Sequence, residues 1–301
     1  MQNKIRIWIK AFRLRTLPLA LSNAVMGGFL AAAEGGFRWV VFIFSILTIT
    51  FLQILSNLAN DYGDAISGKD NETRIGPVRV TQSGLVSKKE IKGLIWSFVI
   101  LSGISGALLI IFGLKDISIA KLSIFFALGI VSIIAALKYT IGKNPYGYRG
   151  FGDIFVFVFF GLVGVVGTYY LHTQWFDLFV IIPASVIGLL STAVLNINNL
   201  RDIDSDKASG KNTIPVRMGV QFSQYYHLLL ISSAILISLV YSLYDMYSGW
   251  QLLFLITVPL FIINIWKVFH YKNPEELNDQ LRNLALTIFI FSLTFGAGMI
   301  I

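Results

Sequence analysis

Cysteine is absent from the 301-residue sequence, which excludes disulfide bonds and thiolate metal sites. Charged residues make up only 13% of the chain and hydrophobic residues 55%, a balance that excludes an ordinary soluble domain. The only histidines, His172, His227 and His270, lack the spacing of a metal site, so we assign them no chemistry. The chain is therefore predicted to lie in a lipid bilayer.

Long apolar runs fill most of the sequence. Nine runs of about 17 to 25 residues are each long enough to cross roughly 30 Å of hydrocarbon. They cover residues 17–34, 38–58, 93–113, 118–137, 151–171, 178–198, 227–245, 250–269 and 283–301. A transmembrane barrel would show short alternating segments instead. The predicted fold class is an all-α membrane protein, a single domain over residues 1–301 with nine transmembrane helices.

The net charge of +8 could indicate nucleic acid or anionic substrates, but the distribution of the basic residues points to membrane topology. The amino terminus and the loops after the even-numbered helices hold 21 of the 24 Lys and Arg residues. The opposite side holds only Arg38, Lys115 and Lys121. The positive-inside rule then predicts a cytoplasmic amino terminus and an external carboxyl terminus, in a bacterial-type inner membrane. We predict no nucleic-acid partner.

The first residues carry five positive charges before an apolar run, a pattern that a cleaved signal peptide also shows. We favour an interfacial amphipathic helix within residues 1–15. Its apolar residues Ile5, Trp8, Ile9 and Phe12 follow the i, i+3, i+4, i+7 spacing of one helix face.

Acidic residues are concentrated after the second and sixth predicted helices, where seven of the sixteen occur: Asp61, Asp64, Asp70, Glu72, Asp202, Asp204 and Asp206. Asn57, Asp61 and Asp64 are spaced i, i+4, i+7, so one helix face presents an amide and two carboxylates. Asn198, Asp202 and Asp206, spaced i, i+4, i+8, are expected to share a face at the end of the sixth helix. An even number of crossings separates the two stretches, which therefore emerge on the same side of the membrane.

Carboxylates gathered at membrane level repel one another unless a cation offsets their charge. Mg²⁺ takes oxygen ligands and is commonly held by one or two carboxylates while substrate phosphates complete its shell. Two acidic faces therefore indicate a clamp for a diphosphate. The alternative is that these acids are solvated loop residues and helix caps.

Basic and polar side chains stand beside the acids and could bind phosphate oxygens. They are Arg74, Arg79, Arg201, Lys207, Lys211 and Arg217, each of which positive-inside bias also explains. The glycines and proline after the fourth helix predict a shaped turn. Its side chains could line the mouth of a cavity: Tyr139, Lys143, Tyr148, Arg149 and Asp153. The glycines 161, 164 and 167 allow close helix packing or leave room for an apolar ligand.

Over nearly its whole length the sequence resembles the UbiA superfamily of intramembrane aromatic prenyltransferases, which have nine helices and two aspartate motifs, after helices two and six. Within it, the chain is most similar to the 1,4-dihydroxy-2-naphthoate polyprenyltransferases. The segments that carry this likeness are Asn60-Asp61-Tyr62-Gly63-Asp64, Gly68-Lys69-Asp70, Arg74-Ile75-Gly76-Pro77, Tyr148-Arg149-Gly150-Phe151-Gly152-Asp153, Asn199-Leu200-Arg201-Asp202, Asp206, Gly210-Lys211 and Thr213. There are two departures: Leu14 stands where proline is common, and Asp153 where glutamate is frequent.

The resemblance implies transfer of a polyprenyl group from a polyprenyl diphosphate to 1,4-dihydroxy-2-naphthoate, with loss of CO2 and diphosphate, to give demethylmenaquinone. It implies Mg²⁺ held by Asn57, Asp61, Asp64, Asn198, Asp202 and Asp206, with the four aspartates catalytic. The implied substrate-binding residues are Asn57, Asn60, Asp70, Arg74, Tyr139, Lys143, Arg149, Asp153, Asn198, Asn199, Arg201 and Lys211. Other acceptors, such as 4-hydroxybenzoate or homogentisate, stay open. So does a cation transporter, which predicts acids near the middle of helices.

Overall fold

The computed structural model describes residues 4–67, 75, 86–116, 118–244 and 246–301. The described residues form no strand. The α-helices are α1 (Lys4–Phe12), α2 (Leu17–Ala33), α3 (Trp39–Ile66), α4 (Lys88–Gly113), α5 (Ile119–Lys138), α6 (Gly152–Val156), α7 (Gly167–Thr173), α8 (Ile181–Arg201), α9 (Ile203–Ala208), α10 (Ile214–Tyr244), α11 (Val258–His270) and α12 (Leu277–Gly298). Shorter or irregular helices are η1 (Leu14–Thr16), η2 (Tyr146–Arg149), the π-helix η3 (Phe157–Val166), η4 (Leu178–Val180), η5 (Gly249–Thr257) and η6 (Pro274–Glu276).

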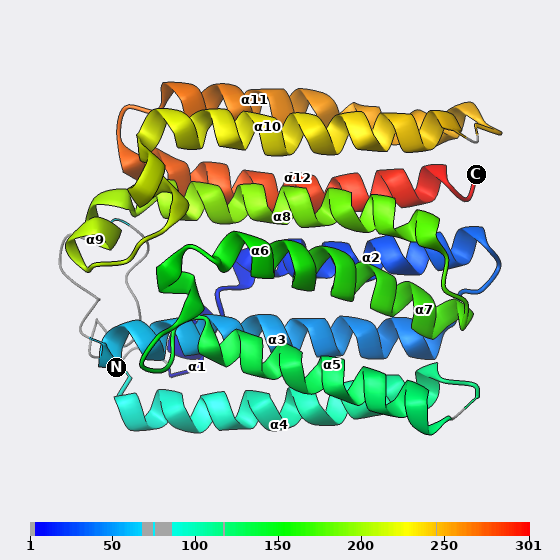
Figure 1. The fold of residues 1–301 in the computed structure, drawn as a ribbon, viewed down its shortest axis with the longest axis horizontal. Coiled ribbons are helices and arrows are strands. Elements are labelled where there is room, and N and C mark those ends of the chain that lie inside the picture. The colour runs from blue at the N-terminus through cyan, green and yellow to red at the C-terminus, as the bar shows by residue number, and fades with distance from the viewer. Residues whose placement is uncertain (1–3, 68–74, 76–85, 117, 245) are drawn as a thin grey trace.

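Nine segments of the described chain are long and apolar enough to cross a bilayer, which confirms the all-α prediction with nine spans. The helices run along the long axis of the molecule, and the two chain ends lie at opposite ends of it (Figure 1). Several helices extend past the apolar runs. α3 continues to Ile66 instead of ending near residue 58, and α10 begins at Ile214, with a break in helical geometry at Gly219. Apolar runs mark only the part of a helix that hydrocarbon surrounds, so its polar ends were missed.

The expectation of one continuous helix through Asn198, Asp202 and Asp206 is wrong. α8 ends at Arg201, Asp202 has φ −95° and ψ 12°, and α9 begins at Ile203. The carboxylate of Asp202 accepts hydrogen bonds from the neighbouring Arg201 side chain, so a local ion pair forms where the helix stops. The i, i+4, i+8 spacing of these three residues therefore did not mean that one uninterrupted helix carries them.

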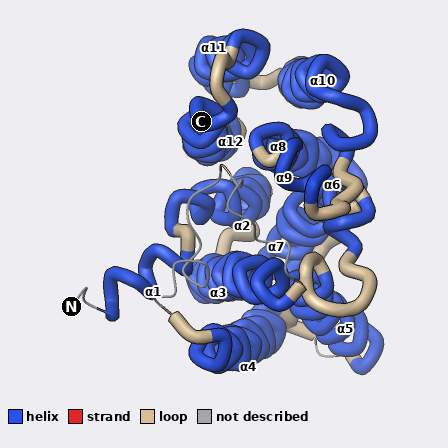
Figure 2. The backbone as a smooth tube through the Cα atoms, turned by 90° about the vertical axis from the view of Figure 1, so that its left-hand side faces the viewer, coloured by secondary structure: helices blue, strands red, loops and turns tan. Residues whose placement is uncertain are grey.

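Apolar side chains pack in two main groups. In Figure 2, α8, α10, α11 and α12 lie toward the top of the bundle, and α3, α4 and α5 toward the bottom. One group joins α2, η3, α7, α8, α10, η5, α11 and α12, with Tyr169, Ile187 and Phe291 in its interior. The other joins α1, α3, α4 and α5 around Leu55, Leu58 and Ile91. α2 also contacts α3, which connects the two groups.

Helix α1 forms where the amphipathic segment was predicted, and it packs against α3. Ile7 and Ala11 are buried, whereas Ile9 is 45% exposed, and Trp8 and Phe12 are partly buried against the α3–α5 group. The side of α1 that contacts α3 therefore differs from the predicted apolar face, because it includes Ile7 and Ala11 and leaves Ile9 exposed. The side chain of Ile5 lies outside the described residues.

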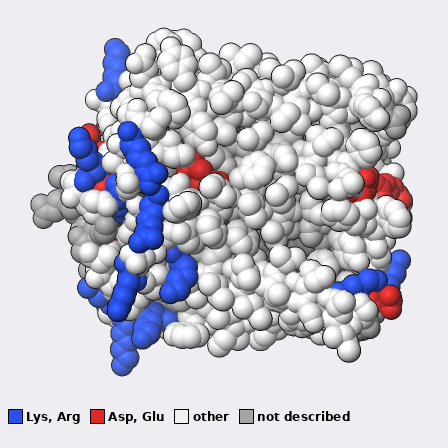
Figure 3. Space-filling model, viewed as in Figure 1, with Lys and Arg blue, Asp and Glu red and all other residues white. Residues whose placement is uncertain are grey.

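Basic side chains gather at one end of the molecule, beside α1 and α9, while the other end carries a few charges of both signs (Figure 3). This distribution agrees with the asymmetry counted along the sequence. Which end faces the cytoplasm stays a prediction.

The glycines of η3 and its junction with α7 serve both purposes considered for them. A Cβ on Gly161 would lie 2.6 Å from the Ala184 carbonyl oxygen and 2.8 Å from the Gly188 Cα, so this glycine permits backbone contact between η3 and α8. A Cβ on Gly167 would meet nothing within 4 Å.

We predict that Gly161→Ala lowers the melting temperature of the purified protein, because the added methyl overpacks a backbone contact at a cost of about 1–3 kcal/mol. Gly167→Ala is the matched control and should melt at or above the wild-type temperature, since helical glycine is itself unfavourable. Equal melting temperatures for the two variants would show that η3 and α8 are not packed this closely.

Candidate active site

The last turns of α3 place the first acidic motif inside the protein. Asn57, Asp61 and Asp64 lie within one helix, as predicted, and are only 4%, 1% and 1% exposed. A Cβ on Gly63 would lie 2.7 Å from the Thr140 carbonyl oxygen, so glycine lets the helix end approach the turn after α5. The Thr140 hydroxyl donates to the Ala59 carbonyl oxygen at 2.9 Å and to the Asn60 side chain at 3.2 Å.

The second acidic motif meets the first around one polar pocket of about 50 Å³. Asp202 and Asp206 are each 6% exposed. The lining residues come from both motifs and from the turns after α5 and α9: Arg13, Asn60, Asp64, Tyr139, Thr140, Gly147, Tyr148, Asn198, Asn199, Asp202, Asp206, Lys211 and Thr213. Residues about 140 positions apart in the sequence thus share one site.

Each of the four aspartates is paired with a cation of the chain. Arg13 forms a salt bridge with Asp61, and Arg201 with Asp202 at 2.5 Å. The Lys211 ammonium group lies 3.3 Å from the Asp64 carboxylate and 3.4 Å from that of Asp206. The first acid of each motif therefore has its own arginine, and the second acids of both motifs share one lysine.

Tyr148 positions the shared lysine. Its hydroxyl donates to Asp64, and Lys211 Nζ lies 5.0 Å from the centre of its ring. The Tyr148 carbonyl oxygen also accepts from the Asn212 backbone N–H at 2.8 Å, which attaches the segment after α9 to η2. Aromatic and carboxylate groups thus hold the ammonium between the two motifs.

Burial changes the acid–base properties of groups around the pocket. Burial raises the pKa of Asp206 to about 6; Lys211 opposes this shift, and the nearby carboxylates of Asp202 and Asp64 add to it. Burial also raises the pKa of Tyr139 well above its ordinary value, and likewise that of Tyr146. Both phenols are therefore neutral hydrogen-bonding groups at neutral pH.

The donor atoms around the pocket suit a hard divalent cation. They are carboxylate and amide oxygens from two sides, and such a metal is normally shared with substrate phosphates. Within the described residues, no three His, Asp or Glu side chains are gathered closely enough to hold a metal by themselves. The chain's own cations already hold these carboxylates, which sequence reasoning did not anticipate.

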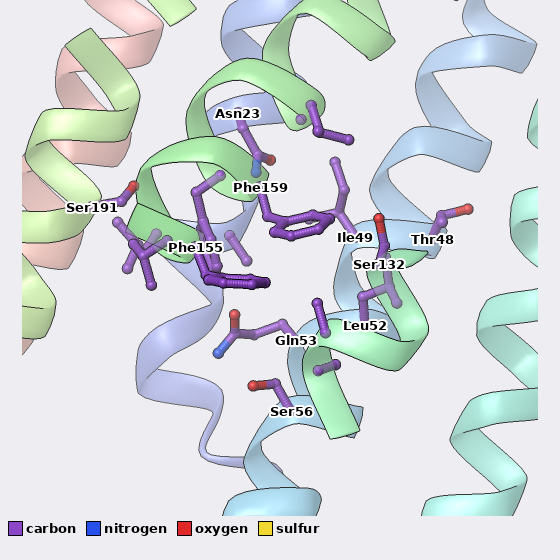
Figure 4. A pocket seen from close by; sticks show the side chains of 18 of the residues that line it. Asn23, Thr48, Ile49, Leu52, Gln53, Ser56, Ser132, Phe155, Phe159 and Ser191 are labelled. Atoms are coloured by element: carbon purple, nitrogen blue, oxygen red, sulfur yellow. The ribbon is translucent and has the colours of Figure 1, made fainter. Parts of the chain in front are cut away.

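A larger and mostly apolar cavity of about 350 Å³ continues from the polar pocket (Figure 4). The two share four lining residues: Arg13, Asn60, Tyr139 and Asn198. From there the cavity passes Gln53, Phe155 and Phe159 and reaches Ile110 and Leu171 near the ends of α4 and α7. Its walls come from helices of both packed groups. Among its described lining residues, Arg13 alone is charged.

Four predicted substrate-binding residues line neither cavity: Lys143, Arg149, Asp153 and Arg201. Arg201 is buried and paired with Asp202. Lys143 and Arg149 are exposed, and the Arg149 carbonyl oxygen accepts a hydrogen bond from Arg217. Asp153 is buried 3.4 Å from the Tyr226 hydroxyl and lines neither cavity. Asp70 and Arg74 lie outside the described residues, as do Glu72 and Arg79.

Sequence reasoning gave Arg13 no role in the site. It lies between α1 and η1 with φ 50°, a left-handed conformation that is uncommon outside glycine, and from there its guanidinium reaches Asp61. Such outliers often mark functional positions. The available signal was a basic residue between the amphipathic segment and the first apolar run.

Known proteins with similar sequences include prenyltransferases. The model of the UbiA prenyltransferase family matches residues 20–293. The chain is 43% identical to a 1,4-dihydroxy-2-naphthoate octaprenyltransferase of Haemophilus influenzae, over 99% of this chain and 97% of that protein. It is 39% identical to the enzyme of the same name from Escherichia coli, over 99% and 96%.

Two solved structures share the fold at low sequence identity. One is an apo UbiA homolog from Aeropyrum pernix, with a TM-score of 0.70 and 18% identity over 96% of this chain and 98% of that one. The other is a UbiA homolog from Archaeoglobus fulgidus bound to GPP and Mg²⁺, with a TM-score of 0.64 and 15% identity over 98% and 99%.

Divalent-metal affinity is predicted to fall as the pH drops below about 6. The raised pKa means that Asp206 takes up a proton through this range, and a metal bound to its carboxylate must displace that proton. Calorimetric titration with Mn²⁺ should show affinity decreasing about tenfold per pH unit below 6 and levelling off above 7. Asp206→Asn should lose this dependence; an unchanged pH profile in that variant would exclude Asp206 as its source.

Proposed function

The chain belongs to the UbiA prenyltransferase family, and we propose that it transfers a polyprenyl group from a polyprenyl diphosphate to 1,4-dihydroxy-2-naphthoate. CO2 and diphosphate are lost and the hydroquinone form of demethylmenaquinone is produced, which a separate two-electron oxidation converts to the quinone. The acceptor is supported by the two relatives at 43% and 39% identity, both named for this substrate. One observation carries the reaction class: acids from α3 and from the α8–α9 junction share Lys211 beside an apolar cavity.

The diphosphate is proposed to occupy the polar pocket, with a divalent metal, Mg²⁺, held by Asn57, Asp61, Asp64, Asn198, Asp202 and Asp206. A metal held there would neutralise the diphosphate and stabilise the charge that develops as the allylic carbon–oxygen bond breaks. With the carboxylates bound to such a metal, Arg13 and Lys211 would be free to pair with phosphate oxygens. The chain's cations thus stabilise acids in one state and a leaving group in the other.

The apolar cavity receives the reacting carbons and the start of the prenyl tail. An allyl cation would be quenched by water, and the cavity walls exclude it. Phe155 and Phe159 lie in the wall of the apolar cavity, where their ring faces can stabilise positive charge (Figure 4). The electron-rich naphthoate ring attacks the allylic carbon, and departure of CO2 restores aromaticity.

The protein is a multi-pass membrane protein, and we place it in a bacterial-type inner membrane. The end that carries the clamp and most basic residues is proposed to face the cytoplasm.

The reaction is tested with purified protein, Mg²⁺, a polyprenyl diphosphate and 1,4-dihydroxy-2-naphthoate, followed by mass analysis. Released diphosphate and a prenylated 1,4-dihydroxynaphthalene are expected, the latter detected as the quinone after oxidation in air. Asp61→Ala and Asp202→Ala should each lower turnover at least about 100-fold through loss of metal and diphosphate binding. Asp204→Ala is the matched control, because Asp204 lies between Asp202 and Asp206 but is exposed, and it should retain activity within about twofold.

Product from 4-hydroxybenzoate, with none from the naphthoate, would reassign the acceptor. Near-normal turnover by either alanine variant would remove that aspartate from the clamp.

The proposed orientation is tested with single cysteines, since the chain has none. Lys115 follows the end of α4 and Lys143 follows the end of α5, so one span separates these two exposed residues. In intact cells without an outer-membrane barrier, a membrane-impermeant maleimide should label Lys115→Cys, but Lys143→Cys only after permeabilisation. The reverse pattern would place the clamp outside.

A further inference from the structure

A directed hydrogen-bond network fixes the orientation of two side-chain amides beside the clamp. The Thr16 hydroxyl donates to the Arg13 carbonyl oxygen at 2.9 Å, so its oxygen is left to accept. The Asn57 side-chain nitrogen donates to the Phe12 carbonyl oxygen at 3.0 Å and to Thr16 Oγ1 at 3.2 Å. Because a backbone carbonyl only accepts, Asn57 must present its nitrogen there and its oxygen on the opposite side.

Gln53 completes this network with its nitrogen. Gln53 Nε2 donates to Thr16 Oγ1 at 3.3 Å and to Asn57 Oδ1 at 3.4 Å. Both partners can only accept from it, so the amide cannot be flipped without losing both bonds. Its oxygen, Oε1, consequently points into the large cavity, toward Phe155 (Figure 4). Oε1 accepts no hydrogen bond from the described residues.

The free amide oxygen matches one feature of the acceptor. In 1,4-dihydroxy-2-naphthoate, the hydroxyl beside the carboxylate is tied to it by an internal hydrogen bond. The remote 4-hydroxyl has no internal partner and, once buried in an apolar cavity, needs an acceptor. Gln53 lies one helical turn from Asn57, at the junction of the apolar cavity and the clamp, where a ring attacking the allylic carbon must lie.

We propose that Gln53 Oε1 accepts a hydrogen bond from the 4-hydroxyl of the acceptor and so orients the naphthoate ring between the clamp and Phe155. This assignment rests on the function proposed above. A hydrogen bond donated by the ring hydroxyl also increases electron density on the ring, which favours attack on an allyl cation.

The test compares two acids that differ only in the remote hydroxyl, 1,4-dihydroxy-2-naphthoate and 1-hydroxy-2-naphthoate. Their anaerobic binding to the purified chain is followed by naphthoate fluorescence, without prenyl diphosphate. Wild type should prefer the dihydroxy acid about tenfold, as expected for one hydrogen bond that satisfies a buried donor. Gln53→Met, which keeps the shape but lacks the acceptor, should bind both acids equally, with unchanged affinity for the monohydroxy acid.

A further variant tests whether the contact is specific to Gln53. Thr48→Val removes a hydroxyl from the same helix deeper in the same cavity and should keep the preference for the dihydroxy acid. If Gln53→Met weakens the binding of both acids equally, Gln53 acts only through Asn57. If Gln53→Met keeps the wild-type preference, or if Thr48→Val abolishes the preference, the contact with the 4-hydroxyl lies elsewhere. Each of these results overturns the assignment. If wild type binds neither acid, the proposed function itself fails, and this inference with it.

Discussion

Neutralisation of four buried aspartates is the constraint on which the rest of the structure depends. Carboxylates this deeply buried are stable as anions only beside compensating charge, and each has a cationic partner among the described residues. Arg13 arrives from the break before α2, Arg201 from the end of α8, and Lys211 from the segment after α9. Of these cations, Lys211 attaches the first and second acidic motifs to each other, because it pairs with Asp64 and with Asp206. The same charges that hold the fold together here are those that a metal and a diphosphate can rearrange.

The two packed groups of helices give this polar end an apolar continuation. Because η3 meets α8 through Gly161 and Gly188 on one side, and α5 packs on α3 and α4 on the other, their walls leave a cavity between them. A charged substrate head and a hydrocarbon tail need opposite surroundings. Here the polar pocket and the apolar cavity meet at Tyr139, Asn60, Asn198 and Arg13, so a molecule with both parts can bind across one boundary.

The sequence was sufficient to predict the nine spans, the helical face of Asn57, Asp61 and Asp64, and the gathering of both motifs, since apolar length and helical periodicity act locally. Prediction from the sequence failed where contacts between distant segments determine the local structure. The break at Asp202 accompanies an ion pair, the π-helical wall has no periodic signature, and the role of Arg13 depends on a single left-handed residue. The direction of the Gln53 amide follows from partners in η1 and α1 that no spacing in α3 reveals.

The central claim is that α3 and the α8–α9 junction form one metal-and-diphosphate site in which Lys211 serves both motifs. A crystal structure with Mn²⁺ and a non-reactive thiolodiphosphate analogue, with data at the manganese absorption edge, tests it most directly. Manganese should be bound by carboxylates of both motifs around one diphosphate, with Lys211 moved from the carboxylates to phosphate oxygens. Manganese held by a single motif, with the diphosphate bound elsewhere, would contradict the account.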